Sequence, residues 1–590
     1  MTERPRLLLG LASVAVAFAA ADTYVVVLAL PEMMNAVGIP IDQLQRAAPI
    51  VSGFLLGYVA MLPLIGRIAD LRGRVPVLVA ALVVFAAGSL ITALAYDMPS
   101  MVVGRFLQGV GGGGLVPATL ALVADLYPVN RRGVPLGIVS AVQEVGSVLG
   151  PLFGAVVLAF ADWRVIFGIN LAVGLVLALA IRSMTFGTKR NENSPPGRRF
   201  PTMDRAKDWP GIGLLLLTIA AGILTMTQPA ALLQDLTWGQ AFIPFVSDGR
   251  WLSPVGVVAM ATAGLLVVRC VTAAHPLVDL RGWAETLRAA DLTGSLFLAL
   301  ALAGVILAFA TADPKVQVFS DQGVWYLLGS AAAAVAFILH LRRADDPLVP
   351  RGAMHRTPAW GSLAVSFFVG AALIAALIDI PLFARTTVHS DSQLLAALVL
   401  VRFLVALPVG AVLGGYLTRT LPAGVVTAAG MALAAVGFVL MSRWGLTTLD
   451  DPTSTIPLLV GGFGFGLALA PVNAAVLAST DHEVHGLATA LVVVSRMVGM
   501  LVGISALTTI GLRRYYAEQA DLANVRDVCG GKSRCAEFTR LLRVAGIAQE
   551  HTVFVGAALC AIVAGVLALL LFRSARTRSI DAGEMLRSAG

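Results

Sequence analysis

Long, uninterrupted apolar runs dominate this sequence. Stretches of about 20 residues with few charges recur from Leu7 to Phe572, and each is long enough to cross a hydrocarbon core of about 30 Å as a helix. Hydrophobic residues make up 58% of the chain and charged residues 13%, about half the charged fraction that is usual in a soluble domain. The sequence therefore predicts an all-α polytopic membrane protein.

We expect about sixteen transmembrane helices, with fourteen as the alternative count. The predicted spans are residues 7–30, 47–67, 75–95, 101–125, 133–160, 165–182, 211–233, 253–273, 291–312, 323–341, 359–385, 392–418, 422–442, 456–478, 488–512 and 552–573.

The net charge of +8 is interpreted as a loop bias and not as a nucleic-acid site. Most Lys and Arg fall in loops on the N-terminal side of the membrane, so the positive-inside rule predicts that both termini are cytoplasmic. A secretory signal is the alternative, because Arg4 and Arg6 precede an apolar run in which Ala17-Phe18-Ala19 imitates a cleavage site. The run continues to Leu30, which favours a retained helix in a cytoplasmic membrane.

An internal repeat divides the chain. Two glycine triplets have the same spacing and lie 353 residues apart: Gly133, Gly146 and Gly150, and Gly486, Gly499 and Gly503. Such repetition predicts two similar six-helix halves, residues 1–182 and 359–573, in parallel orientation, which requires an even number of spans between them.

The linker 183–358 supplies that even number, with four predicted transmembrane helices. It also contains an amphipathic segment, 274–290, that is expected to lie at the membrane interface. Pro276-Leu277-Val278 is echoed by Pro347-Leu348-Val349, which indicates either a duplicated hairpin or a chance match. Residues 574–590 are expected to form a cytoplasmic tail.

The loop after the second span has a distinctive pattern of glycine, acid and arginine. It contains Gly66, Asp70, Gly73 and Arg74, and its arginines can pair with Asp125 at the inner end of the fourth span. Glycine allows close helix approach, and an acid can cap a helix N-terminus. The string matches the pattern G-x-x-x-D-x-x-G-R, and the chain resembles the major facilitator superfamily, in which this string is a cytoplasmic gating motif.

A second motif narrows the resemblance to the drug:proton antiporter branch with linker helices. The fifth span carries Gly146, Gly150, Pro151 and Gly154, which match the antiporter motif except that Ala155 replaces its last glycine. Glycines at this spacing form a smooth strip for helix packing. The two extra linker helices depart from that branch.

Several further strings are similar to those of mycobacterial exporters linked to triacylglyceride and drug efflux. They are Asp22-Thr23, Gln143-Glu144, Asp162-Trp163-Arg164, Asp379 and Ser495-Arg496-Met497. The resemblance implies lipid or lipophilic substrates, proton coupling without a cofactor, and a periplasmic lipid-carrier lipoprotein as a candidate partner of a monomeric transporter.

Charged residues inside the spans are candidates for proton coupling, because a charge facing lipid costs several kcal/mol. Asp22 lies near mid-membrane among alanines and valines on its own helix and is the first candidate for the proton carrier; a structural polar residue is the alternative. Glu144 faces away from the glycine strip, and the repeat places Arg496 at a nearly equivalent site. Arg105 is interpreted as either a coupling residue or a structural anchor.

Asp379 and Arg402 lie nearer the outer ends of their helices. For these two residues we expect pairing or snorkelling in preference to proton relay.

The loop 513–551 is the one large segment predicted outside the membrane besides the linker. Its Cys529 and Cys535 lie on the predicted oxidising side, where a disulfide is expected. Its flanks are helix-forming, so they could extend the last two helices as a stapled external hairpin. That hairpin is either a substrate-transfer or docking element or a simple solvated loop.

These observations predict a proton-coupled exporter of lipids or lipophilic compounds, and the alternative within transporters is multidrug efflux without a lipid role. A membrane-embedded enzyme or scramblase is the rival class. Only His482, Glu483 and His485, in an inside loop, hint at a catalytic cluster, and we expect them to be solvated. No enzyme activity and no metal site are predicted.

Overall fold

The computed structural model describes residues 3–39, 48–185, 208–246, 249–310, 322–388, 393–530, 535–575 and 577. No β-strand occurs among these residues. Fifteen of their helices are long and apolar enough to cross a membrane, and α6, with 28 residues, fills the remaining predicted span. The all-α polytopic membrane fold is therefore confirmed, with fifteen candidate spans where about sixteen were expected.

The first group of helices packs around α5. It consists of α1 (Glu3–Ala36), α2 (Ala48–Leu55), the π-helical turn η2 (Leu56–Ala60), α3 (Leu62–Arg72), α4 (Arg74–Ala93), α5 (Met98–Leu126), α6 (Gly133–Phe160) and α7 (Trp163–Thr185).

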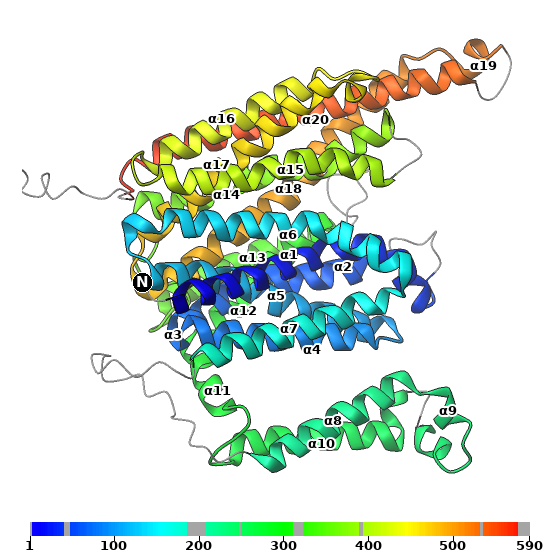
Figure 1. The fold of residues 1–590 in the computed structure, drawn as a ribbon, viewed down its shortest axis with the longest axis vertical. Coiled ribbons are helices and arrows are strands. Elements are labelled where there is room, and N and C mark those ends of the chain that lie inside the picture. The colour runs from blue at the N-terminus through cyan, green and yellow to red at the C-terminus, as the bar shows by residue number, and fades with distance from the viewer. Residues whose placement is uncertain are drawn as a thin grey trace, which may run out of the picture.

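The last group packs around α17 and α20. It consists of α14 (Thr357–Thr386), α15 (Gln393–Leu417), α16 (Ala423–Met441), α17 (Thr455–Ser479), α18 (His485–Ala520), α19 (Val525–Val528) and α20 (Ala536–Leu571). Figure 1 shows the two groups stacked side by side, with α6 and α15 along their boundary.

Two helix pairs come from the middle of the chain. They are built from α8 (Trp209–Thr227), α9 (Ala230–Leu233), α10 (Pro254–Thr272), α11 (Leu280–Ala289), α12 (Leu292–Ala310) and α13 (Gly323–Arg343). The α8–α10 pair stands at the edge of the molecule (Figure 1), whereas α12 contacts α2, α3, η2 and α18. We call the end of the molecule that carries the α3–α4 loop the inner end, after the side predicted for it.

The two linker pairs share one capping arrangement. In the first pair, the Asp208 carboxylate accepts from Gly211 N at 3.0 Å, from Leu277 N at 3.2 Å and from Arg269 Nε at 2.8 Å. Burial alone would raise the pKa of Asp208, but these donors outweigh it and hold the pKa below its ordinary value.

The second pair repeats the arrangement around Asp291. Its carboxylate accepts from Gly294 N at 2.9 Å and Leu348 N at 2.8 Å, and it pairs with His340 Nε2 at 2.8 Å. Matching caps at matching positions favour duplication of one hairpin unit over a chance match of short strings.

The first glycine triplet sets the contact between α6 and α1. A Cβ on Gly146 would collide with the backbone of Ala17, and one on Gly150 would collide with the backbone of Ala21. Close approach of the two helix backbones therefore requires glycine at both positions.

The second triplet sets the corresponding contact between α18 and α14. A Cβ on Gly499 would collide with the backbone of Phe367, and one on Gly503 with that of Ala371. These contacts pair α14 residues 367 and 371 with α1 residues 17 and 21, which gives a register for comparing the two helix groups.

The first member of each triplet lies at the boundary between the groups. Gly133 packs against Gly415 on α15, and Gly486 packs against Gly66 on α3, in each case backbone against backbone. The same sequence repeat thus produces two equivalent contacts at the inner end.

Candidate functional site

A buried ion pair joins α1 to α5. Asp22 Oδ2 lies 2.7 Å from Arg105 Nη1, and the two residues are 2% and 1% exposed. The Arg105 guanidinium lies 4.4 Å from the centre of the Phe54 ring. Because both charges are removed from water, each depends on the other for neutralisation.

Further polar groups complete this cluster. Asn170 Nδ2 of α7 donates to Asp22 Oδ1 at 2.6 Å, and Arg105 Nη1 donates to Gln108 Oε1 at 2.9 Å. Gln108 in turn donates to Ser89 Oγ at 2.9 Å. The cluster therefore ties together α1, α4, α5 and α7 of one helix group.

Asp22 has polar partners that its own helix does not supply. Its neighbours on α1 are apolar and buried, as the spacing predicts, but Arg105 and Asn170 reach it from other helices. A helical wheel of one span cannot show partners on other spans. Asn170 is itself a polar residue within an apolar run, and such residues usually have a polar partner.

A second buried ion pair crosses the boundary between the helix groups. Arg496 Nη1 of α18 lies 3.7 Å from Glu144 Oε1 of α6, and both side chains are 8% exposed. Tyr58, in the π-helical turn η2, is close enough to interact electrostatically with both charges. π-helical turns within helices are often found at functional sites, and no residue pattern indicated this one.

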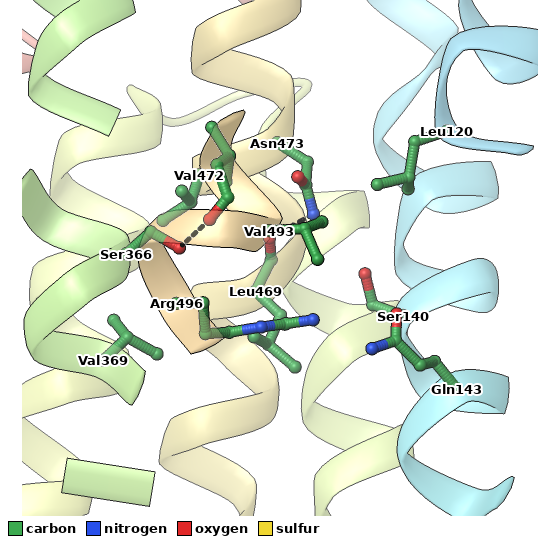
Figure 2. A pocket seen from close by; sticks show the side chains of 11 residues that line it. Leu120, Ser140, Gln143, Ser366, Val369, Leu469, Val472, Asn473, Val493 and Arg496 are labelled. Atoms are coloured by element: carbon green, nitrogen blue, oxygen red, sulfur yellow. Dashed lines mark hydrogen bonds between the residues drawn. The ribbon is translucent and has the colours of Figure 1, made fainter. Parts of the chain in front are cut away.

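A small pocket adjoins Arg496 between the two groups. Figure 2 shows the Arg496 side chain reaching from α18 toward Ser140 and Gln143 of α6. The remaining lining is mainly apolar, with Leu120, Val369, Leu469, Val472, Val492 and Val493, beside Ser366 and Asn473. The free space in this pocket holds about one water molecule.

The two ion pairs lie at different depths. Gly146 contacts Ala17 and Gly150 contacts Ala21, so α1 and α6 run in parallel and Glu144 lies level with residue 15 of α1. At 1.5 Å per residue, Asp22 is about 10 Å nearer the outer end than Glu144.

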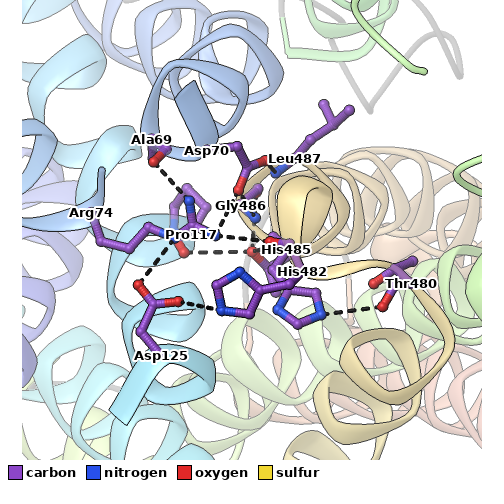
Figure 3. Close-up of polar contacts among 11 residues, drawn as sticks. Ala69, Asp70, Arg74, Pro117, Asp125, Thr480, His482, His485, Gly486 and Leu487 are labelled. Carbon is purple, nitrogen blue, oxygen red and sulfur yellow. Dashed lines mark hydrogen bonds and ion pairs between the residues drawn. The ribbon is translucent and has the colours of Figure 1, made fainter. Parts of the chain in front are cut away.

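The inner end is closed by a carboxylate that caps a helix of the other group (Figure 3). Asp70 accepts hydrogen bonds from Gly486 N at 2.7 Å and Leu487 N at 2.9 Å, in the first turn of α18. Arg74 Nη2 pairs with the same carboxylate at 2.9 Å. The helix dipole and the free amides of a helix N-terminus favour an acid at this position.

Arg74 makes a second set of contacts to close the inner end. It donates to the carbonyl of His482 at 3.2 Å, and its Nε lies 3.6 Å from Asp125 Oδ2. His482 Nε2 lies 3.0 Å from the other oxygen of Asp125. Gly73 has φ of +98°, which glycine adopts without strain, so the chain can turn directly from α3 into α4.

Comparison with known proteins identifies the family. A family model described as Major Facilitator Superfamily matches residues 12–345, more than half of the chain. A triacylglyceride transporter of Mycobacteroides abscessus is 33% identical over 544 residues, which cover 90% of this chain and 88% of that protein. The chain belongs to the major facilitator superfamily. It is a multi-pass membrane transporter.

Two further relatives of this superfamily member also carry the name triacylglyceride transporter. A triacylglyceride transporter of Mycobacterium tuberculosis is 34% identical over 525 residues, covering 86% of this chain and 83% of that one. Another, from Mycolicibacterium smegmatis, is 31% identical over 577 residues, covering 95% and 86%. A solved proton:xylose symporter has a TM-score of 0.53 at 13% identity, covering 99% of both chains, and shares the fold.

The outer end of this transporter carries the longest helices. α18 and α20 have 36 residues each, or about 54 Å, which exceeds the hydrocarbon thickness of about 30 Å. Their excess length forms the outer hairpin, residues 513–551, which projects beyond the other helices in Figure 1. Cys529 and Cys535 are joined by a disulfide near its tip.

Of three other polar residues singled out in the sequence, only His485 lies in an environment that contradicts its expectation. His485 is buried, 3% exposed, with Nε2 3.2 Å from the Thr480 carbonyl, so the prediction that it is solvated is wrong; its place in the first turn of α18 draws it into the inner closure. Arg402 is half-buried, and its Nη1 donates to Thr455 Oγ1 at 3.3 Å. Asp379 is 4% exposed, and its partner is another acid.

Among the described residues, no group of three or more His, Cys, Asp or Glu side chains could hold a metal ion. Asp22 and Arg105 bind each other, as do Glu144 and Arg496.

Proposed function

We propose that this transporter exports lipids or lipophilic compounds from a bacterial cytoplasmic membrane in exchange for protons. Sequence kinship over most of the chain to mycobacterial triacylglyceride transporters is the observation that carries the substrate class. The pocket beside Arg496 has a mixed lining of six apolar and five polar residues, so the substrate class rests on this kinship and not on the pocket.

Proton coupling is assigned to the two buried ion pairs. A proton that binds Asp22 removes its charge and releases Arg105, while a proton that binds Glu144 releases Arg496. The Glu144–Arg496 pair joins the two helix groups, so its protonation weakens their contact at the centre of the protein.

Helix α18 connects the central pair to the inner closure. Arg496 lies ten residues after Gly486, about 15 Å along the helix, and the first turn of α18 is held by Asp70. A shift of α18 after Arg496 is released therefore acts on the Asp70 contact. In this scheme the two parallel halves are residues 1–182 and 359–573, and the linker 183–358 lies at one side. Alternating access arises when the halves rock about the Glu144–Arg496 pair.

The same proposal places the outer hairpin outside the cytoplasm and both termini inside it, following the distribution of Lys and Arg. The hairpin and its disulfide then face an oxidising compartment. A periplasmic lipid-carrier protein is the partner expected there, and the transporter itself is expected to be a monomer. Multidrug efflux without a lipid role is the second candidate, because lipophilic drugs share the apolar character of the proposed lipid substrates.

The test is transport in proteoliposomes that contain the purified protein. Labelled triacylglyceride and a lipophilic cationic dye are compared with and without a proton gradient, and with an ionophore that collapses it. We expect gradient-dependent movement of the lipid, retained in the control Asp450→Asn, which alters an exposed carboxylate. Lipid movement that ignores the gradient contradicts the coupling; dye movement without lipid movement favours the second candidate.

A further inference from the structure

A pair of acidic side chains is buried between α14 and α20. Asp379 is 4% exposed and Glu550 is 1% exposed, and the two carboxyl groups are in hydrogen-bonding contact. Glu550 Oε2 has no hydrogen-bond partner among the described residues and is fully shielded from solvent. Neither residue belongs to the two ion pairs described above.

No cation neutralises this carboxyl pair. Within the described part of the chain, no Lys, Arg or His lies within 4.0 Å of either carboxyl. The other charged groups on the helices around this pair are directed elsewhere. Arg402 of α15 donates to Thr455, and His551 of α20 contacts the Trp444 carbonyl. Four arginines are exposed: Arg385 of α14, Arg513 and Arg514 of α18, and Arg443 after α16. The charge of the pair is therefore unbalanced.

The contact itself requires a proton. An ionised carboxylate is only an acceptor, so two carboxyl groups can share a hydrogen bond only when one of them is protonated. Two ionised carboxylates in contact repel each other, and burial makes that repulsion stronger. One shared proton would therefore satisfy both carboxyl groups in this contact.

The carboxyl pair lies closer to the outer end of the protein than the two ion pairs do. In the register set by the glycine contacts, Ala17 corresponds to Phe367, so Asp22 corresponds to residue 372 of α14. Asp379 is seven residues beyond that point, about 10 Å nearer the outer end. Glu144, Asp22 and Asp379 are therefore spaced along the transport axis in steps of about 10 Å.

The pair also lies at the base of the outer hairpin. Glu550 is one turn of α20 before Phe554, whose ring packs on Phe383 of α14 and on Trp444, with centroid distances of 6.4 and 6.2 Å. His551 Nε2 lies 2.6 Å from the Trp444 carbonyl. Glu550 thus lies on one arm of the hairpin itself, next to the turn of α20 that packs on α14 and on Trp444.

We propose that Asp379 and Glu550 form a proton-binding site near the outer end, which takes one proton from the external side and holds α14 against α20. When the proton leaves, both carboxylates are ionised, and α14 and α20 separate at the hairpin base. The site deepens the proposed proton-coupled function and rests on it for its role in transport. Proton binding by the pair stands independently of any substrate.

Infrared pH titration of the purified protein tests the binding site without transport. The wild type should show a protonated-carboxyl band that disappears as the pH rises, and Asp379→Asn and Glu550→Gln should each remove it. An amide in either position still donates to the remaining carboxylate, so folding should be preserved. Asp450→Asn is the matched control, and Glu550→Asp should retain a shifted band.

Transport at varied external pH tests the role of the site. The transport rate of each amide variant should no longer depend on external pH but should still depend on internal pH. The Glu550→Asp variant should keep part of the dependence on external pH. A band unchanged in both amide variants overturns the proposal, as does unchanged dependence on external pH in both. A thermal unfolding midpoint that rises with Na⁺ in the wild type, but not in the amide variants, would show that the pair binds a metal ion. That result would also overturn the proposal. If transport proves independent of protons while the band behaves as expected, the proposed function fails but the proton site stands.

Discussion

Asp22 Oδ2 and Arg105 Nη1 lie 2.7 Å apart in a region from which water is excluded. The proton carrier expected from the sequence is therefore not a lone acid in an apolar environment. It is half of an ion pair, and loading it with a proton requires that Arg105 find other acceptors. Gln108, already bonded to Arg105 at 2.9 Å, is the nearest of these.

Asp22→Asn should abolish transport driven by a proton gradient, because the amide cannot titrate. It should also lower stability, since breaking a buried pair from one side costs about 3–5 kcal/mol, although the amide oxygen still accepts from Arg105. Gradient-driven transport in proteoliposomes and thermal unfolding measure the two effects.

The double variant Asp22→Asn with Arg105→Gln separates the two roles. This double variant lacks the Arg105 charge that Asp22→Asn leaves without a partner. Its stability should therefore recover, while transport stays absent. Recovery of transport together with stability would mean that Asp22 serves only the structure.

Glu144 and Arg496 should behave as one unit. Glu144→Gln and Arg496→Gln should each impair transport and stability, and the double variant should cost less than the sum, with a coupling energy of about 0.5–3 kcal/mol. The exposed pair Arg514 and Glu518 is the control, for which coupling of at most about 1 kcal/mol is expected. Strictly additive losses at positions 144 and 496 would show that the two residues act separately.

The fold was predictable because its signals are local. A span of apolar residues needs no knowledge of its neighbours, and the spacing of Gly146 and Gly150 on one face of a helix indicates close packing without naming the partner. The partner, α1, became visible only in the structure, because the choice among many apolar helices depends on tertiary packing.

The candidate site was predictable in its acids but not in its pairings. Asp22, Glu144 and Arg496 stand out as charges within apolar runs. Glu550 did not, because the helix that carries it extends beyond the membrane and the residue was assigned to the external hairpin. Asn170 was overlooked, although a polar amide in the sixth predicted span, the helix α7, is the kind of signal that could have found it.

Gly486→Ala should weaken the inner closure. The added Cβ would collide with the Gly66 carbonyl, which belongs to the backbone and cannot move aside as a side chain could. An overlap of this kind typically costs about 1–3 kcal/mol, so the population with an open inner end should rise roughly tenfold.

A cysteine at Leu120, which lines the central pocket, reports that opening. Its modification by a membrane-impermeant thiol reagent applied from the inner side should be faster in the Gly486→Ala background. Gly213→Ala, where a Cβ meets nothing within 4 Å, should leave the rate unchanged. Equal rates in the two backgrounds would contradict a closure that depends on the contact between α3 and α18.

The outer hairpin should matter more for large lipids than for small dyes. Its two arms are continuous with α18 and α20, so it can guide a long substrate away from the membrane without a separate domain. Deleting residues 520–545 should reduce triacylglyceride export several-fold more than efflux of a lipophilic dye, both measured in the same proteoliposomes. The double variant Cys529→Ser with Cys535→Ser keeps the hairpin but removes its staple, and it should affect both substrates only slightly. Equal losses of lipid and dye transport after the deletion would mean that the hairpin supports the fold. Arg496 lies on α18, so a distortion of α18 would impair transport of every substrate.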